Sequence, residues 1–215
     1  WLQTSGVNTL RADYTVDAEG VFTSFAIVQT ASSDYPTLRR HRIGVGLYAE
    51  VDQKLVLADR VETDIAGPRT EIAELVGKQR GDLVLLNDGD LTYAKIRLDE
   101  HSLNTLLTGS ARLDDSLARA LCWGSAWDMT RDAELPPSVF VELVLGAVGT
   151  ETDLTAVSAL LRQANSAGML FAADSKRDEV RARLANGVHE LLLDAAPGSD
   201  HQLAFARALA ASAQD

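Results

Sequence analysis

Residues 83–99 read LVLLNDGDLTYAKIRLD, and the hydrophobic pattern of the chain changes at the end of this stretch. Before it, short runs rich in β-branched and aromatic residues alternate with turn residues, which is typical of β-strands. After it, apolar residues recur at intervals of three and four, the period of an amphipathic helix. We therefore predict an all-β domain over residues 10–98 and an all-α domain over residues 99–215, preceded by a linker over residues 1–9.

The first half contains runs of strand character at spacings of about 8–15 residues, with no helical run between them. The predicted strands are Leu10–Val16, Val21–Val28, Arg42–Tyr48, Leu55–Val61, Arg69–Leu75, Leu83–Leu86 and Leu91–Leu98. This arrangement predicts an antiparallel β-sandwich. Asp17–Gly20 and Ala49–Gln53 are short enough to be hairpin loops. Gly44 and Gly46 loosely match a dinucleotide-binding fingerprint, but they lie inside a strand, which favours close packing or a bulge.

The second half contains six predicted helices. They lie at residues 102–107, 115–132 and 139–148 and around the apolar stripes 154–164, 180–192 and 203–210. Asp99 is the expected N-cap of the first, Thr152 or Asp153 of the fourth, and Ser199 or Asp200 of the sixth. The short loops between consecutive helices predict antiparallel neighbours stacked as a HEAT-like solenoid array.

The composition excludes several classes of protein. The 215 residues include 31 acidic and 20 basic side chains, a net charge of −11, which is unfavourable for binding nucleic acid. Residues 99–215 hold 17 acidic and 9 basic residues and so carry most of this imbalance. No run approaches the length of about 20 apolar residues that spans a membrane. The single cysteine, Cys122, predicts a reducing, cytoplasmic setting.

No motif supplies catalytic residues or metal ligands. The four histidines are His41, His101, His189 and His201. His189-Glu190 begins like a zinc peptidase helix, but a second histidine would have to stand at position 193, which is leucine. The Gly-x-Ser-x-Gly motif of serine hydrolases is absent. We predict no catalytic residue and no metal ligand in this chain.

Other conspicuous residues have structural interpretations. Asn87–Asp90 is expected to form a turn rather than a calcium loop. Arg39–Arg42 is interpreted as an exposed strand entry, with an acidic partner as the alternative. Trp123 and Trp127 share one helix face and are predicted to anchor a core or a domain interface, and Cys122 to be an inert buried thiol.

Three stretches together resemble a known family. Trp1–Asn8 (WLQTSGVN), Leu83–Asp99 and Leu117–Leu135 (LARALCWGSAWDMTRDAEL) are similar to the C-terminal half of the aminopeptidase N family of zinc metallopeptidases. The preference for arginine over lysine, 16 against 4, together with abundant alanine, resembles the branch from bacteria of high GC content. The resemblance covers nearly the whole chain, although none of these motifs is catalytic.

The resemblance implies a four-part enzyme that removes single residues from peptide N-termini. Its zinc site and its substrate-amine loop belong to a catalytic domain that these 215 residues lack, so the zinc cofactor is expected in the parent enzyme only. The tyrosine that stabilises the reaction intermediate belongs there too, so Tyr14, Tyr35, Tyr48 and Tyr93 inherit no role. The expected partners are the catalytic and N-terminal domains of the same polypeptide and peptide substrates.

The implied role of this chain is therefore non-catalytic. The resemblance implies that residues 1–9 are the linker from the missing catalytic domain and that residues 99–215 are the N-terminal part of the family's α-helical C-terminal domain. We expect the chain to support the catalytic domain, with the helical part gating access of peptides to the active site. The substrate-binding residues are unknown; Arg131, Arg162 and Arg181 are candidates, by charge alone, to meet a peptide carboxylate. The start at Trp1 suggests a piece of a longer protein, and the alternative is a free-standing β-sandwich and helical-repeat module for protein interaction.

The last helical stripe gives one more expectation. Leu203, Phe205, Ala206 and Leu209 are apolar, and no polar cap is visible after them. Because a solenoid buries its last helix only against a further helix or a cap, we expect exposed apolar surface and self-association there.

Overall fold

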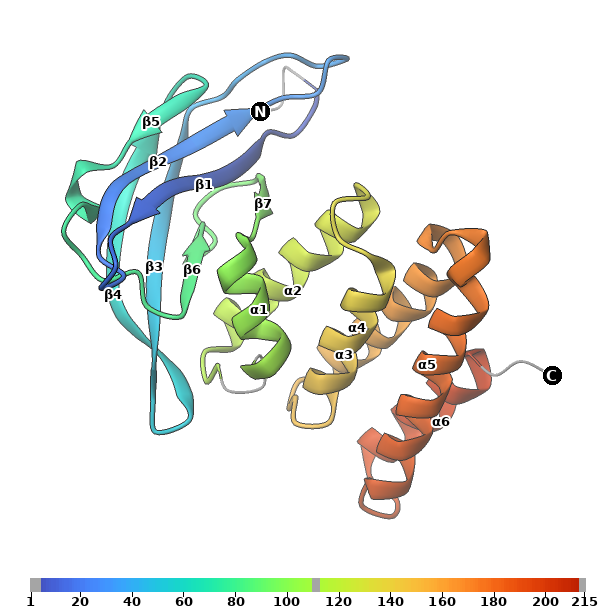
Figure 1. The fold of residues 1–215 in the computed structure, drawn as a ribbon. Helices are drawn as coiled ribbons and strands as arrows, with labels where there is room; N and C mark the ends of the chain where they lie inside the picture. The colour runs from blue at the N-terminus through green and yellow to red at the C-terminus, as the bar shows by residue number, and fades with distance from the viewer. Residues whose placement is uncertain (1–4, 110–112, 213–215) are drawn as a thin grey trace. The chain divides into compact units, whose positions relative to one another are not determined.

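The computed structural model describes residues 5–109 and 113–212 (Figure 1). The chain divides into two compact units, Trp1–Ser125 and Ala126–Asp215. The change from strands to helices falls between Arg97 and Glu100, as the sequence pattern predicts. The domain boundary after residue 98 stays a prediction, and so does the linker over residues 1–9, of which residues 1–4 lie outside the described residues.

The first unit contains two β-sheets. One has the strand order β5-β2-β1-β7 and the other the order β4-β3-β6. The strands are β1 (Thr9–Val16), β2 (Phe22–Thr30), β3 (His41–Val51), β4 (Lys54–Ile65), β5 (Arg69–Glu71), β6 (Leu83–Leu86) and β7 (Lys95–Arg97). The pairs β1–β2, β2–β5, β3–β4 and β3–β6 are antiparallel, whereas β7 runs parallel to β1.

Both sheets contribute side chains to one apolar core. Leu10 and Ile27 enter it from the first sheet, and Ile43 and Val45 enter it from the second. Phe22 and Phe25 are buried with their ring centroids 5.1 Å apart in an edge-to-face arrangement, which is a favourable geometry for two aromatic rings. The predicted order, β-strands first and helices after them, is therefore confirmed: the strands form two sheets, and the helices follow in the chain.

Two predicted strands are shorter than expected. In the run Arg69–Leu75 only β5 is a strand, and Ala73–Leu75 forms a 3₁₀ turn that brings Leu75 into the core. In the run Leu91–Leu98 only β7 is a strand. The cause of the second difference is the turn at Asn87–Asp90, where Asn87, Gly89 and Asp90 all have positive φ and the following residues leave the sheet.

The helices begin close to their predicted caps. They are α1 (Glu100–Gly109), α2 (Ser116–Arg131), α3 (Pro137–Val148), α4 (Leu154–Ser166), α5 (Asp174–Asp194) and α6 (Asp200–Ser212). The Asp99 carboxylate accepts a hydrogen bond from the Ser102 amide at 3.0 Å, and Asp153 accepts one from the Thr155 amide at 2.8 Å. At the start of α6 it is Ser199 whose hydroxyl accepts from the Gln202 amide. No helix within the described residues has the length and apolar character needed to cross a membrane.

The second unit is built around α3. Phe140 and Val144 on this helix are fully buried, and α3 packs against α4 and α5. The half-buried Trp127 ring lies 5.3 Å from that of Phe140, centroid to centroid, so Trp127 packs against the core of this unit. A short π-helix at Ala167–Phe171, which the sequence pattern did not predict, separates α4 from α5.

The last helix, α6, exposes part of its apolar stripe as expected. Leu203 and Ala206 are exposed. Phe205 is buried, contrary to the expectation for this residue, and the helix that carries it, α6, packs against α4 and α5.

Candidate functional site

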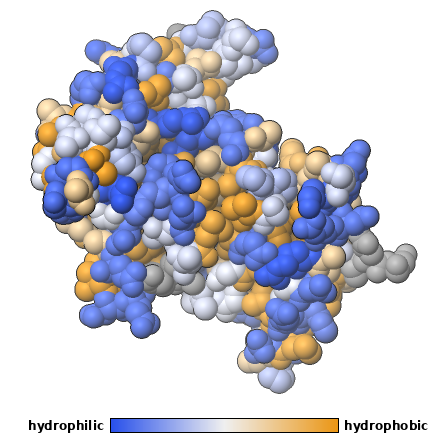
Figure 2. Space-filling model, viewed as in Figure 1, coloured by the Kyte–Doolittle hydropathy of each residue, from blue (hydrophilic) through white to orange (hydrophobic). Residues whose placement is uncertain are grey.

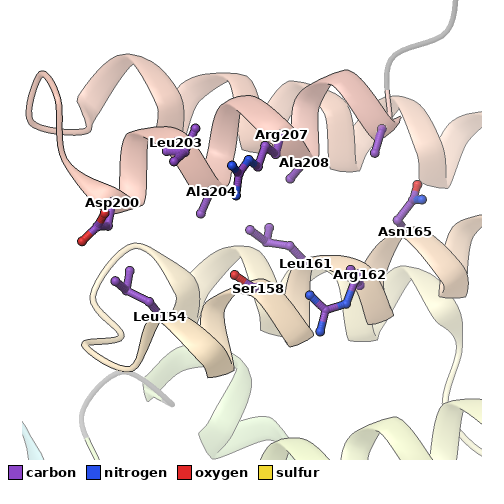
Figure 3. A pocket seen from close by; sticks show the side chains of 11 residues that line it. Leu154, Ser158, Leu161, Arg162, Asn165, Asp200, Leu203, Ala204, Arg207 and Ala208 are labelled. Carbon is purple, nitrogen blue, oxygen red and sulfur yellow. The ribbon is translucent and has the colours of Figure 1, made fainter.

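A groove lies between α4 and α6 in the second unit (Figure 3). It has a volume of about 410 Å³. Leu154 and Leu161 approach it from α4, and the α6 side is formed largely by the small side chains of Ala204, Ala208 and Ala211. Because alanine fills little of the space opposite Leu161, the two helices leave an open, mostly apolar channel between them.

Two cations border this groove. Arg162 of α4 and Arg207 of α6 line it and are exposed, and neither forms an ion pair or a hydrogen bond with another described residue. Asp200 lies near one end of the groove and Asn165 near the other (Figure 3). An apolar channel with two uncompensated guanidinium groups is suited to an apolar group that carries carboxylates, since arginine binds carboxylates with strong, charge-assisted hydrogen bonds.

The three arginines singled out by charge occupy different places. Arg162 is the one that borders the groove. Arg131 is exposed at the end of α2. Arg181 lies on α5 with its Nε atom buried, next to Gly168 of the π-helix. The structure thus does not bring these three arginines together. Charge alone did not single out Arg207, although the alanine-rich run 203–211 around it was a signal that could have indicated it.

In the first unit, Asp88 is the centre of a buried polar cluster. Arg60 Nε donates a hydrogen bond to Asp88 Oδ2 and Arg60 Nη2 donates to the Asp88 carbonyl oxygen, both at 2.9 Å. Tyr48 donates its hydroxyl to Asp88 Oδ1 at 2.8 Å. Burial, followed by the hydrogen bond to Asp88, raises the pKa of Tyr48 above its usual value. The predicted turn at Asn87–Asp90 is confirmed, and the cluster ties it to the sheet.

This cluster explains the two glycines of β3. A Cβ atom at Gly44 would overlap the Asp88 carbonyl oxygen and lie 2.6 Å from Arg60 Nη2. A Cβ atom at Gly46 would lie 2.8 Å from the Tyr48 ring. The pairing of β3 with β4 also shifts register between Leu47 and Tyr48. Close packing and a bulge, rather than a phosphate-binding loop, therefore account for the glycines, as predicted.

A second buried polar cluster corrects the interpretation of Arg39–Arg42. Arg39 and His41 are buried, so this segment is not simply an exposed strand entry. His41 Nε2 lies 3.0 Å from Gln29 Oε1 and 3.2 Å from Asn8 Oδ1, and His41 Nδ1 lies 2.9 Å from Thr92 Oγ1. Since Nε2 faces two amide oxygens, it carries the proton of a neutral imidazole, and Nδ1 accepts from the threonine hydroxyl. The side-chain amides that contact Arg39 and His41 belong to Asn8 and Gln29, which lie in other segments of the chain.

The burial of His41 predicts a pH dependence of stability. Burial, and secondarily the charge of Arg39, lowers the pKa of His41 below its usual value. Below about pH 6.5 the unfolded chain therefore binds a proton at this position that the folded chain does not. The free energy of unfolding should fall with decreasing pH, by up to about 1.4 kcal/mol per pH unit from this group.

Urea unfolding between pH 7 and pH 5 measures this effect. His41→Gln should flatten the dependence, because glutamine does not titrate, while His189→Gln, on the exposed face of α5, serves as the matched control. An equal slope for wild type and His41→Gln would contradict the assignment.

The other residues that could have acted in catalysis or metal binding are hydrogen-bonded to the backbone or buried. His101 Nε2 bonds the Gly81 carbonyl at 3.2 Å, and His201 Nε2 bonds the Glu151 carbonyl at 2.7 Å. Burial raises the pKa of Cys122 to about 12, so the thiol is unreactive at neutral pH, as predicted. Within residues 5–109 and 113–212, no group of three or more histidine, cysteine, aspartate or glutamate side chains is arranged to hold a metal ion.

Comparison with known proteins agrees with the resemblance seen in the sequence. Over 222 aligned residues, the chain is 48% identical to Aminopeptidase N of Streptomyces lividans. The alignment includes the whole of this chain but only 26% of that protein, so the chain spans about a quarter of the length of its relative. Residues 83–215, more than half of the chain, match a family of C-terminal domains. The chain belongs to this family, the ERAP1-like C-terminal domains.

Proposed function

We propose that this chain is the non-catalytic C-terminal part of a zinc-dependent aminopeptidase, which removes N-terminal residues from peptides. The observation that carries the proposal is the 48% identity to an Aminopeptidase N along the entire chain. In this proposal zinc and the reacting groups belong to the catalytic domain of the same polypeptide. The chain by itself is then inactive, and its partners are the catalytic and N-terminal domains.

The two halves have different roles in this proposal. The first forms a β-sandwich that supports the catalytic domain, consistent with two sheets that share one core. The second is a HEAT-like array that limits which peptides reach the active site. The five residues between α3 and α4, and the five between α5 and α6, are short links of the kind that connect stacked antiparallel helices.

A cation on the helical half would fix the length and direction of a peptide by meeting its C-terminal carboxylate. Arg131 and Arg162 are both exposed and form no ion pair with other described residues, so they remain available for this role. Arg181 is less suitable, because its Nε atom is buried.

The test uses charge reversal in the full-length enzyme. Arg131→Glu and Arg162→Glu are compared on a peptide with a free C-terminal carboxylate, on the same peptide as its amide, and on an aminoacyl chromogenic substrate. If one of these arginines meets the carboxylate, its variant should lower kcat/KM for the free peptide by about tenfold. The same variant should leave the chromogenic substrate unaffected, because that substrate does not reach the helical half.

Arg40→Glu is the control, since Arg40 is also exposed but lies in the β half. Equal losses on all three substrates would indicate damage to the fold instead of a contact with the carboxylate. If neither variant distinguishes the free peptide from its amide, the proposed contact is wrong.

A further inference from the structure

The groove between α4 and α6 has the size and the lining of a small-molecule site. Its volume of about 410 Å³ lies within the range of about 300–1,000 Å³ that is usual for ligand pockets. Leu154, Leu161 and Leu203 give it an apolar surface, and the small alanine side chains of α6 leave the space opposite Leu161 open. Pockets of this kind hold a ligand by apolar contact and orient it with a few polar groups.

The polar groups of the groove differ in charge from one end to the other. Arg162 and Asn165 are three positions apart, so they lie on one side of α4, and Arg207 lines the groove from α6. The Asp200 carboxylate lies near the opposite end from Asn165 (Figure 3). A bound carboxylate is attracted by the two guanidinium groups and repelled by Asp200, so an apolar carboxylate has one preferred orientation in the groove.

The walls of the groove have no free backbone groups along their middle part. The lining residues within 158–162 and 203–208 lie inside α4 and α6, where backbone amides and carbonyls are hydrogen-bonded within the helix. A peptide laid along this part would bury its own amide groups without partners, which costs free energy. A hydrocarbon chain has no such groups. The lining therefore favours a hydrocarbon chain over a peptide.

The apolar surface is long enough for an acyl chain. Leu154 and Arg162 are eight positions apart on α4, which is about 12 Å along the helix axis. Leu203 also lines a second hollow of about 620 Å³, together with Leu192 and Leu193. Figure 2 shows apolar and strongly hydrophilic surface side by side at the end of this unit where α5 meets α6. The apolar surface thus continues past the end of the groove.

The two cations also need an explanation, since neither has an ion pair among the described residues although the helical half holds 17 acidic and 9 basic side chains. We propose that the α4–α6 groove binds a medium-chain fatty acid, with its carboxylate at Arg162 and Arg207 and its acyl chain along Leu161. This site goes beyond the proposed function and does not depend on it, because it concerns this chain alone. A ligand there covers Arg162 and leaves Arg131 as the candidate for a peptide carboxylate.

Isothermal titration calorimetry of the 215-residue chain with decanoate, below the concentration at which decanoate forms micelles, tests the site. Wild type should bind one decanoate with a dissociation constant in the micromolar range. Methyl decanoate, which lacks the charge, should bind about tenfold more weakly. Hexanoate keeps the carboxylate but buries fewer CH₂ groups, so it should also bind more weakly than decanoate.

Two sets of substitutions separate the carboxylate contact from the acyl contact. Arg162→Gln/Arg207→Gln should weaken decanoate binding by about tenfold or more and leave methyl decanoate binding unchanged, because only decanoate uses the guanidinium groups. Ala204→Leu/Ala208→Leu fills the groove while keeping both arginines, and it should weaken the binding of both ligands. A general loss of structure in the arginine variant would weaken both ligands as well, so the methyl ester distinguishes the two causes.

The matched control is Arg40→Gln/Arg131→Gln, which removes the same charge at exposed positions that do not line the groove and should bind decanoate as wild type does. The proposal is overturned if wild type shows no saturable binding up to about 1 mM decanoate, or if the two arginine substitutions in the groove do not discriminate between decanoate and its methyl ester. Tighter binding of acetyl-leucyl-leucine than of decanoate would assign the groove to peptide C-termini and would also overturn it.

Discussion

Phe140→Ala is expected to lower the free energy of unfolding by about 3–5 kcal/mol, the usual cost of removing a buried phenylalanine side chain. Phe140 is fully buried on α3, the helix around which the second unit packs. Its ring contacts that of Trp127, and Trp127 in turn meets the ring of Phe171 edge to face at 5.8 Å. The substitution therefore removes apolar contact area and also leaves a cavity between aromatic side chains that are held in place by their own helices.

Urea unfolding followed by circular dichroism and tryptophan fluorescence measures this loss. Leu170→Ala is the control, because Leu170 is equally apolar but 69% exposed, and its replacement should change the free energy of unfolding by less than about 0.5 kcal/mol. Equal effects of the two substitutions would show that the α3 core does not stabilise this unit.

Asp88→Ala is expected to cost about 3 kcal/mol, at the low end of the range for breaking a buried ion pair. The carboxylate is almost fully buried, and its removal leaves Arg60 Nε and the Tyr48 hydroxyl without their acceptors. The low end applies because the Arg60 side chain remains 29% exposed and keeps part of its hydration. Arg60 also retains its bond to Glu62.

A surface ion pair provides the comparison for Asp88. Asp64 pairs with Arg42 at 3.1 Å, but its side chain is 76% exposed, so Asp64→Ala should cost less than about 1 kcal/mol. Both variants remove one aspartate from a pair with an arginine, and they differ in burial. If their urea midpoints shifted equally, burial of the Asp88 cluster would have no energetic consequence.

Local signals in the sequence were sufficient for much of the fold. The cap residues Asp99 and Asp153, and the hydrophobic periods on either side of residue 98, identified the helices and their starting points. These signals are reliable because a cap or an amphipathic stripe is decided by residues within about four positions of one another. The lengths of β5 and β7 were less predictable, because each pairs with only three residues of a longer strand and is bounded by a turn, the 3₁₀ turn after β5 and the Asn87–Asp90 turn ahead of β7.

The candidate site was less accessible to sequence reasoning. Arg162 could be named by its charge, but its position beside Arg207 depends on how α4 and α6 pack, and these arginines are 45 positions apart. Arg39 and His41 looked like part of an exposed basic cluster, and they are buried because amide side chains from distant segments receive them.

The sequence by itself therefore determined the order and type of the elements, the family resemblance, and the structural role of the β3 glycines. Only the tertiary structure decided that β7 pairs parallel with β1, that Arg60 meets Asp88, and that alanines on α6 leave a groove bordered by two arginines. The physical reason is the range of the interactions. Helical periods and caps arise between neighbours in the chain, whereas strand pairing, buried ion pairs and grooves arise between residues that only the folded chain brings together.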